Sequence, residues 1–134
     1  TYYIPTAALR QEGTSYQYQV PSREVETDEI AVRAIETALD KAGVPHCRCK
    51  TWTTDCFYRE TKAMVNQRKD EGYAVVEMEC ASTAACAKFR GIQFAQLLFT
   101  ADTLANVEKH DTRNWAKECF VTALKLALDA VTEL

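Results

Sequence analysis

The chain has 134 residues, 47% of them hydrophobic and 26% charged, which is the balance of an ordinary globular domain. Its 16 basic and 19 acidic residues are interspersed, so no electropositive stripe is available to neutralise a nucleic-acid backbone. The longest apolar runs, at 94–98 and 121–131, are too short or too interrupted to span a bilayer, and no secretory signal opens the chain. We therefore expect one cytoplasmic domain, 1–134, that binds neither nucleic acid nor membrane.

The six cysteines do not form a metal-binding pattern. No C-x-x-C pair is matched by a second pair at the spacing of zinc ligands. Cys47 and Cys49 alternate on a predicted strand, so both sulfurs face one side, where small buried hydrophobic residues are commoner than ligands. The sequence predicts reduced thiols, no metal and no cofactor.

The first half of the chain alternates between extended and helical patterns. An apolar strand opens it, and a loop or hairpin follows over 11–23, with Gly13 and Pro21 as turn residues. Thr27 is the expected cap of a helix whose apolar residues recur at spacings of three and four until Gly43. An extended run over 47–54 follows.

The second half continues the alternation. A helix is expected over about 60–69, and a buried strand follows that opens at Ala74 and ends in Glu77-Met78-Glu79. A helix is then expected over 81–89, ending before Gly91. The apolar run 92–100 predicts a strand in the middle of a parallel sheet, covered on both faces.

A last helix is expected to begin at Asp111 or Thr112. The residues predicted for its buried apolar face are Trp115, Cys119, Phe120, Ala123, Leu124, Ala127, Leu128 and Val131. The alternation of strands and helices predicts an α/β fold in which sequential parallel strands are joined by right-handed crossovers.

Ligands of open α/β sheets bind beyond the carboxyl ends of the strands, so polar residues there are the candidate site. Glu77 and Glu79 are two positions apart at one strand end, and two neighbouring carboxylates are costly unless something, such as a sugar diol, binds them. Equally open is the alternative that one is exposed and the other caps the helix that follows.

Two further strand ends carry candidate residues. Asp102 follows the apolar run 97–100, where partial desolvation raises a carboxyl pKa as a general acid requires, although a capping or turn-forming Asp is the commoner occupant of such a position. Phe57 and Tyr58 offer a flat surface for a heterocycle, although such a pair more often belongs to a core.

These strand ends, in this order, make the sequence similar to the nucleoside phosphorylase family, which includes purine nucleoside phosphorylase and uridine phosphorylase. The resemblance covers nearly the whole chain, and the Glu77-Met78-Glu79 box is its most specific part; the others are 5–15, 54–58 and 100–102. It implies a three-layer fold with a central, mostly parallel (mixed) sheet flanked by helices, here without the N-terminal strands of the family.

The resemblance also implies the reaction and the roles of the site residues. Family members cleave the bond between base and ribose with inorganic phosphate as co-substrate, giving the free base and ribose 1-phosphate. By resemblance, Glu79 binds the ribose 2′ and 3′ hydroxyls, Met78 packs beneath the sugar, Phe57 stacks on the base with Glu77 beside it, and Asp102 gives a proton to purine N7. These groups suit a reaction in which the sugar becomes cationic and the base anionic.

Asp102 favours the purine branch, because the uridine branch usually has apolar residues there and a Gln-x-Arg pair, absent here after Tyr58. Arg113 is the nearest counterpart of the arginine that assists this aspartate, although the loop differs in length. The residues that flank Asp102, Ala101 and Thr103, depart from the usual Ser and His of the family.

The family's phosphate-binding segments lie ahead of Thr1, and Arg10, Arg23 and Thr14 are not obvious replacements. We therefore expect this chain alone to lack the phosphate site and not to turn over. A uridine phosphorylase, a nucleosidase and a non-catalytic nucleoside-binding domain stay open as alternatives. By resemblance, the complete protein is a homo-oligomer, either a dimer or a hexamer.

Overall fold

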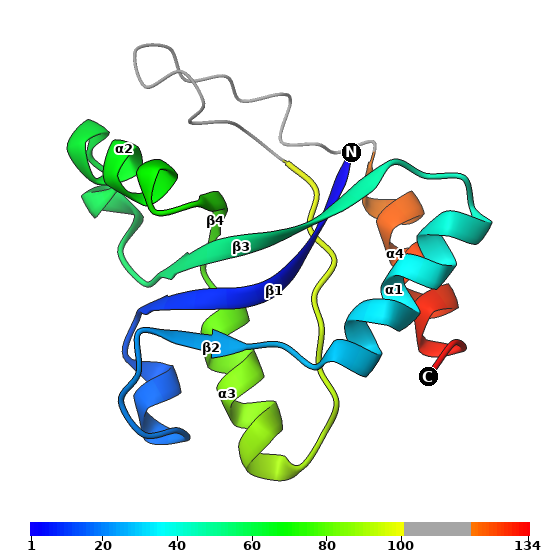
Figure 1. The fold of residues 1–134 in the computed structure, drawn as a ribbon, viewed down its shortest axis with the longest axis horizontal. Coiled ribbons are helices and arrows are strands. Elements are labelled where there is room, and N and C mark those ends of the chain that lie inside the picture. The colour runs from blue at the N-terminus through cyan, green and yellow to red at the C-terminus, as the bar shows by residue number, and fades with distance from the viewer. Residues whose placement is uncertain (101–118) are drawn as a thin grey trace.

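The computed structural model describes residues 1–100 and 119–134. Its sheet has the order β2-β1-β3-β4 (Figure 1), formed by β1 (Tyr2–Gln11), β2 (Glu24–Glu26), β3 (His46–Thr54) and β4 (Tyr73–Glu77). β3 runs parallel to both β1 and β4, and β2 is an antiparallel edge strand. The predicted α/β fold with a mostly parallel, mixed sheet is confirmed.

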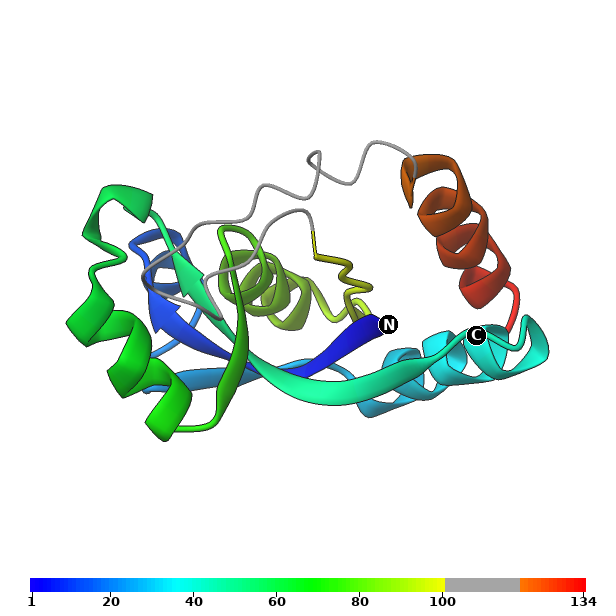
Figure 2. The same ribbon diagram turned by 90° about the horizontal axis from the view of Figure 1, so that it is seen from above.

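Helices cover both faces of the sheet. They are α1 (Glu29–Lys41), α2 (Lys62–Asp70), α3 (Cys80–Arg90) and α4 (Phe120–Val131), with 3-10 turns η1 (Thr14–Gln17) and η2 (Phe57–Arg59). Side chains alternate along a strand, so Ala8 packs in one cluster with α3, while its neighbour Leu9 packs in another with Val65 of α2. Figure 2 shows α2 at one end of the molecule and α1 with α4 at the other. The result is the expected three layers.

The segment after β1 is ordered by a buried arginine. The Arg10 guanidinium donates hydrogen bonds to Ser15 Oγ (2.8 Å), Ser22 Oγ (2.7 Å), Val20 O (2.7 Å) and Gln19 O (3.1 Å). The loop predicted over 11–23 therefore contains η1 and is held to the end of β1.

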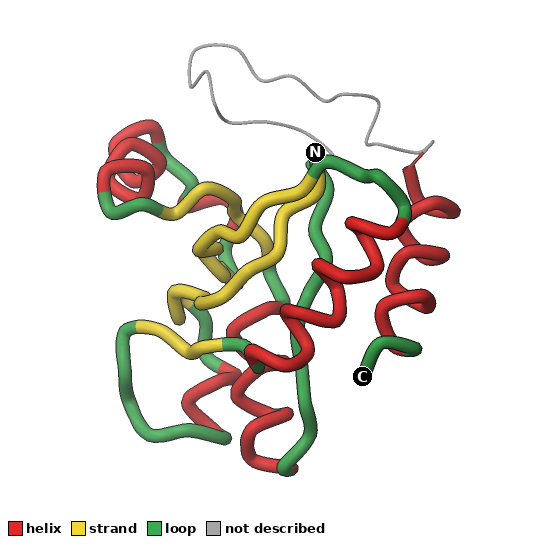
Figure 3. The backbone as a smooth tube through the Cα atoms, turned by 45° about the vertical axis from the view of Figure 1, so that its right-hand side comes forward, coloured by secondary structure: helices red, strands yellow, loops and turns green. Residues whose placement is uncertain are grey.

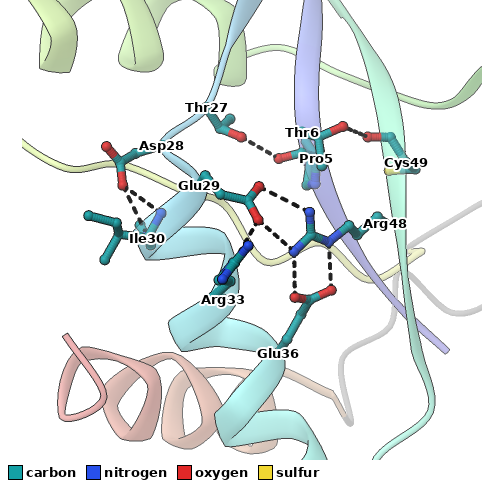
Figure 4. A network of polar contacts seen from close by, with 11 residues as sticks. Pro5, Thr6, Thr27, Asp28, Glu29, Ile30, Arg33, Glu36, Arg48 and Cys49 are labelled. Atoms are coloured by element: carbon teal, nitrogen blue, oxygen red, sulfur yellow. Dashed lines mark hydrogen bonds and ion pairs between the residues drawn. The ribbon is translucent and has the colours of Figure 1, made fainter.

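The first helix begins one residue later than expected. Asp28, and not Thr27, caps α1, because its Oδ1 accepts the N–H groups of Ile30 (3.0 Å) and Ala31 (3.1 Å) (Figure 4). The Thr27 hydroxyl instead donates to Pro5 O at 2.7 Å. Thr27 thus fixes the approach to the helix by bonding to β1.

An ion-pair network joins α1 to β3. Arg48 donates two hydrogen bonds to each of Glu29 (both 3.0 Å) and Glu36 (both 2.7 Å), and Arg33 donates to Glu29 at 2.9 Å (Figure 4). These hydrogen bonds hold the pKa of both glutamates below its ordinary value. The network fixes the exposed side of α1 to the strand.

The neighbouring cysteines differ from expectation. Cys49 is half-buried, and burial raises the pKa of its thiol to about 12, whereas Cys47 is exposed. The prediction that both sulfurs are buried is therefore wrong for Cys47. Within the described ranges, no three His, Cys, Asp or Glu side chains gather as a metal ion would need.

The strand predicted over 92–100 does not form. This segment is drawn as loop in Figure 3 and makes one antiparallel bridge, in which Tyr3 and Leu98 exchange two hydrogen bonds of 2.8 Å. The reason is that β3 occupies one side of β1 along its length, and β2 occupies the other side over Ala7 to Leu9. Only the start of β1 is left to pair with the run.

The buried face of α4 is also not the predicted one. Leu126 and Ala130 pack against α1 residues such as Val32 and Leu39, whereas the predicted core positions Phe120, Leu124, Leu128 and Val131 are exposed. Because this helix is apolar on most of its circumference, periodicity could not select the packed face. No helix among the described residues combines the length and apolarity that a bilayer crossing requires.

Candidate functional site at the carboxyl edge of the sheet

The parallel strands β3 and β4 end side by side. Thr53, the last residue but one of β3, is in register with Glu77, the last residue of β4. The segments that leave the two strands, η2 and the start of α3, therefore begin at the same edge of the sheet. The predicted residues Phe57, Glu77, Met78 and Glu79 all belong to these segments or directly precede them.

Glu77 is the structural centre of this edge. Its Oε1 accepts hydrogen bonds from the hydroxyls of Thr53 (2.5 Å) and Thr51 (3.2 Å). Its Oε2 accepts the backbone N–H groups of Glu79 (2.8 Å) and Cys80 (2.6 Å). The four bonds use both oxygens, so the contacts seen give Glu77 the role of fixing the turn between β4 and α3.

The protonation of Glu77 follows from this position. Burial raises the pKa of its carboxyl above the ordinary value, although the hydrogen bonds from Thr53 and the backbone oppose the shift. A carboxylate at the N-terminus of α3 is also favoured by the unpaired N–H groups of the first helical turn. The sequence left open whether both carboxylates bind a ligand or one of them caps the helix that follows. Glu77 has the second role, because it accepts N–H groups at the start of α3.

Met78 and Glu79 lie on the turn that Glu77 holds. β4 ends at Glu77, so the strand alternation that was expected to align Glu77 with Glu79 does not continue to Glu79. Glu79 is exposed and its Oε2 lies 3.3 Å from the Met78 backbone nitrogen, and Met78 is 44% exposed. An exposed carboxylate, which accepts the Met78 N–H through one oxygen, and an apolar side chain are therefore presented together at the sheet edge.

Phe57 and Tyr58 form an exposed aromatic pair on η2. Their ring centroids are 3.9 Å apart, and they are 53% and 80% exposed. The alternative that this pair belongs to the core is therefore wrong. An exposed flat aromatic surface can stack on a heterocycle, and an exposed carboxylate at the same edge of the sheet can accept hydroxyl donors.

Two of the predicted site residues are not placed. Asp102 and Arg113 lie outside the described residues, and their roles stay predictions from the sequence.

Thr51 and Thr53 are the site residues that sequence reasoning missed. Both are buried, and Thr53 Oγ also accepts the N–H of Ala81 at 3.0 Å, which ties β3 to the first turn of α3. The available signal was their alternation on either side of Trp52 at the strand end, which aims both hydroxyls at one face of the sheet.

Fold and site together define an α/β protein with a candidate ligand site at the carboxyl edge of parallel strands. The sequence model of the phosphorylase superfamily matches residues 1–134, and the chain belongs to this superfamily.

Two solved structures are similar to the chain. AMP nucleosidase from Bacteroides thetaiotaomicron has a TM-score of 0.80 at 22% identity, over 98% of this chain and 54% of that chain. The P. knowlesi homologue of P. falciparum PNP has a TM-score of 0.74 at 18% identity, over 96% of this chain and 52% of that chain. The chain thus spans about half the length of these structures, and the likeness establishes the fold.

Proposed function

We propose that this chain is the nucleoside-binding portion of a purine nucleoside phosphorylase, which converts a purine nucleoside and phosphate into the free base and ribose 1-phosphate. The observation that carries the proposal is the exposed group of Phe57, Met78 and Glu79 at the carboxyl edge of β3 and β4. Membership of the phosphorylase superfamily supports it.

In this proposal the exposed groups bind the two halves of the nucleoside. The Glu79 carboxylate accepts hydrogen bonds from the ribose 2′ and 3′ hydroxyls, Met78 packs under the sugar, and Phe57 stacks on the base. Glu77 lies beside the base site and holds the turn through its contacts with Thr51, Thr53 and the α3 backbone. A rigid turn favours binding because less conformational freedom is lost when the ligand arrives.

The proton transfer is assigned to residues known here from the sequence alone. Asp102 protonates N7 of the purine as the glycosidic bond breaks, and Arg113 assists it; without this proton the base would leave as an anion. The complete protein is proposed to act as a homo-oligomer, a dimer or a hexamer, that takes a nucleoside and phosphate.

A nucleosidase is the second candidate, in which water replaces phosphate as the nucleophile. The similarity to a structure described as an AMP nucleosidase supports it. The two reactions differ in their need for phosphate, so one assay separates them. A uridine phosphorylase would instead release uracil.

The test follows base release by chromatography from inosine, adenosine, AMP and uridine, with and without phosphate, in parallel with calorimetric binding of inosine to this chain. Phosphate-dependent purine release supports the phosphorylase, and release without phosphate supports the nucleosidase. Inosine binding without turnover supports the nucleoside-binding portion.

The variants Glu79→Gln and Asp102→Asn identify the site, and Glu26→Gln, an exposed glutamate on β2, is the matched control. We expect Glu79→Gln to weaken inosine binding at least about tenfold, because hydrogen bonds to a carboxylate are stronger than those to an amide. Absence of both binding and base release, or equal effects of Glu79→Gln and Glu26→Gln, would refute the proposal.

A further inference from the structure

A second candidate site lies on the α2 side of the sheet. A pocket of about 220 Å³ is lined by Leu9 and Gln11 of β1, Tyr16 of η1, Arg68 of α2, and the arginines Arg10 and Arg23. Leu9 packs with Val65 of α2, whereas Glu77 is bonded to the backbone of α3, so the pocket is separate from the edge site. Three arginines therefore line a hollow that the proposed nucleoside chemistry does not use.

Arg23 and Arg68 are brought together by one carboxylate. Glu71 Oε2 accepts a hydrogen bond from Arg23 at 2.7 Å and from Arg68 at 2.9 Å. The Arg68 guanidinium is further held by a bond to Gln11 Oε1 (3.0 Å) and lies 5.7 Å from the centre of the Trp52 ring. Both arginines are thus oriented before any ligand arrives.

These arginines keep hydrogen-bonding capacity. Arg68 is 13% exposed by side chain, and its buried Nε has no hydrogen-bond partner among the described residues. Arg23 is 59% exposed and donates to Glu71 through one nitrogen. Arg10 contributes mainly charge, because four of its N–H groups are already bonded to the 15–22 segment.

Charge favours an anion in the pocket. None of the lining residues is acidic. Glu71 offsets one of the three arginines, and another nearby carboxylate, Glu24, pairs with Lys50 at 3.1 Å. The Glu12 carboxylate accepts the Ser15 N–H at 2.9 Å. When Glu12 is counted as well, the charge around the pocket is still positive.

We propose that this pocket binds a phosphate group, free or on a small phosphorylated molecule, through Arg23 and Arg68. Guanidinium groups suit tetrahedral oxyanions, because their planar N–H donors bind two oxygens at once. The pocket has room for a phosphate group, because its volume of about 220 Å³ is several times the volume of about 30 Å³ that one water occupies in the liquid. The site is separate from the co-substrate phosphate of the proposed reaction.

The test is an NMR titration of the Arg Nε–Hε signals of the ¹⁵N-labelled chain at constant ionic strength. The probes are inorganic phosphate, glycerol 1-phosphate as a simple monoester, and sodium chloride. We expect a saturable shift of the Arg68 signal with phosphate and none with chloride. Tighter binding of the monoester would identify a phosphorylated molecule as the ligand, and tighter binding of inorganic phosphate would identify the free ion.

Variants assign the site. Arg23→Gln and Arg68→Gln are each expected to weaken phosphate binding at least about tenfold. Arg33→Gln, which removes an exposed arginine of α1, is expected to leave it unchanged. Arg23 is largely exposed, so Arg23→Gln is informative even if Arg68→Gln fails to fold. A linear shift like that of chloride, or equal affinity in Arg23→Gln and Arg33→Gln, would overturn the proposal, and neither result depends on turnover of a nucleoside.

Discussion

Replacement of Thr53 by valine tests whether Glu77 and Thr53 hold the turn of the candidate site. Valine keeps the branched shape but removes a hydroxyl that donates to Glu77 Oε1 at 2.5 Å and accepts the Ala81 N–H at 3.0 Å. Loss of a bond to a charged group costs about 1.5–3 kcal/mol, and an unsatisfied buried N–H costs about 1–3 kcal/mol. Because the losses share one side chain, we expect Thr53→Val to lower the free energy of unfolding by about 2–4 kcal/mol in total.

Thr51→Val is the matched control. Thr51 is equally buried and donates to the same Glu77 oxygen at a longer 3.2 Å, but it accepts no N–H from α3. We expect it to cost about 1 kcal/mol. Urea unfolding followed by circular dichroism measures both variants. For a slope of about 2 kcal/mol/M, the midpoint of Thr53→Val should fall by about 1–2 M. A Thr53→Val midpoint equal to that of Thr51→Val or of the unchanged chain would refute the reasoning.

Three further changes probe other parts of the fold. Burial raises the pKa of Glu77, so the folded protein carries a cost when this carboxyl is ionised, and the cost disappears as the pH falls through the raised pKa toward the ordinary 4.5. In urea titrations, the unfolding free energy of the unchanged chain should therefore rise relative to that of Glu77→Gln as the pH falls from 7 to 4.5. A difference between the two unfolding free energies that stays constant over this range would contradict the raised pKa. Asp28→Ala should cost about 1 kcal/mol by removing the α1 cap, and Asp28→Asn should restore most of it in the same titrations. Leu126→Ala should cost about 2–4 kcal/mol, whereas Leu124→Ala on the exposed side of α4 should change stability by less than about 0.5 kcal/mol, and equal costs would show that the packed face is assigned wrongly.

Local signals in the sequence were sufficient for most helices and strands. Gly91 follows α3 and has the left-handed φ of +66° that such a position requires, and hydrophobic spacing located α1 within two residues. The parallel order of β1, β3 and β4 also followed from the alternation of strands and helices.

The failures arise where the outcome depends on a competing partner. The run 92–100 is as apolar as a central strand, but β2 and β3 already occupy β1, which no local pattern reveals. Thr27 and Asp28 are both good caps, and the bond from Thr27 to Pro5, on another element, decides between them. Long-range pairing is thus the information that the local pattern lacks.

The location of the candidate residues at a strand end was predictable from the sequence, whereas their contacts were less so, and their part in ligand binding stays a prediction. The resemblance pointed to Phe57, Met78 and Glu79, which are exposed at the sheet edge. That Glu77 accepts four hydrogen bonds was not predictable, because two donors come from Thr51 and Thr53, more than twenty positions earlier. The contacts of Asp102 and Arg113 stay predictions.

The pairing of β1 with β3 has a consequence for folding kinetics. Their partners are far apart in the chain, as in the bond from Thr6 to Cys49 across 43 positions, and α1 lies between them. The central pair of the sheet can form only after that long loop has closed, and such non-local pairing places the folding of a domain toward the millisecond-to-second range. During this interval the newly formed strands expose unpaired edges, so refolding should give the highest yield from dilute solution.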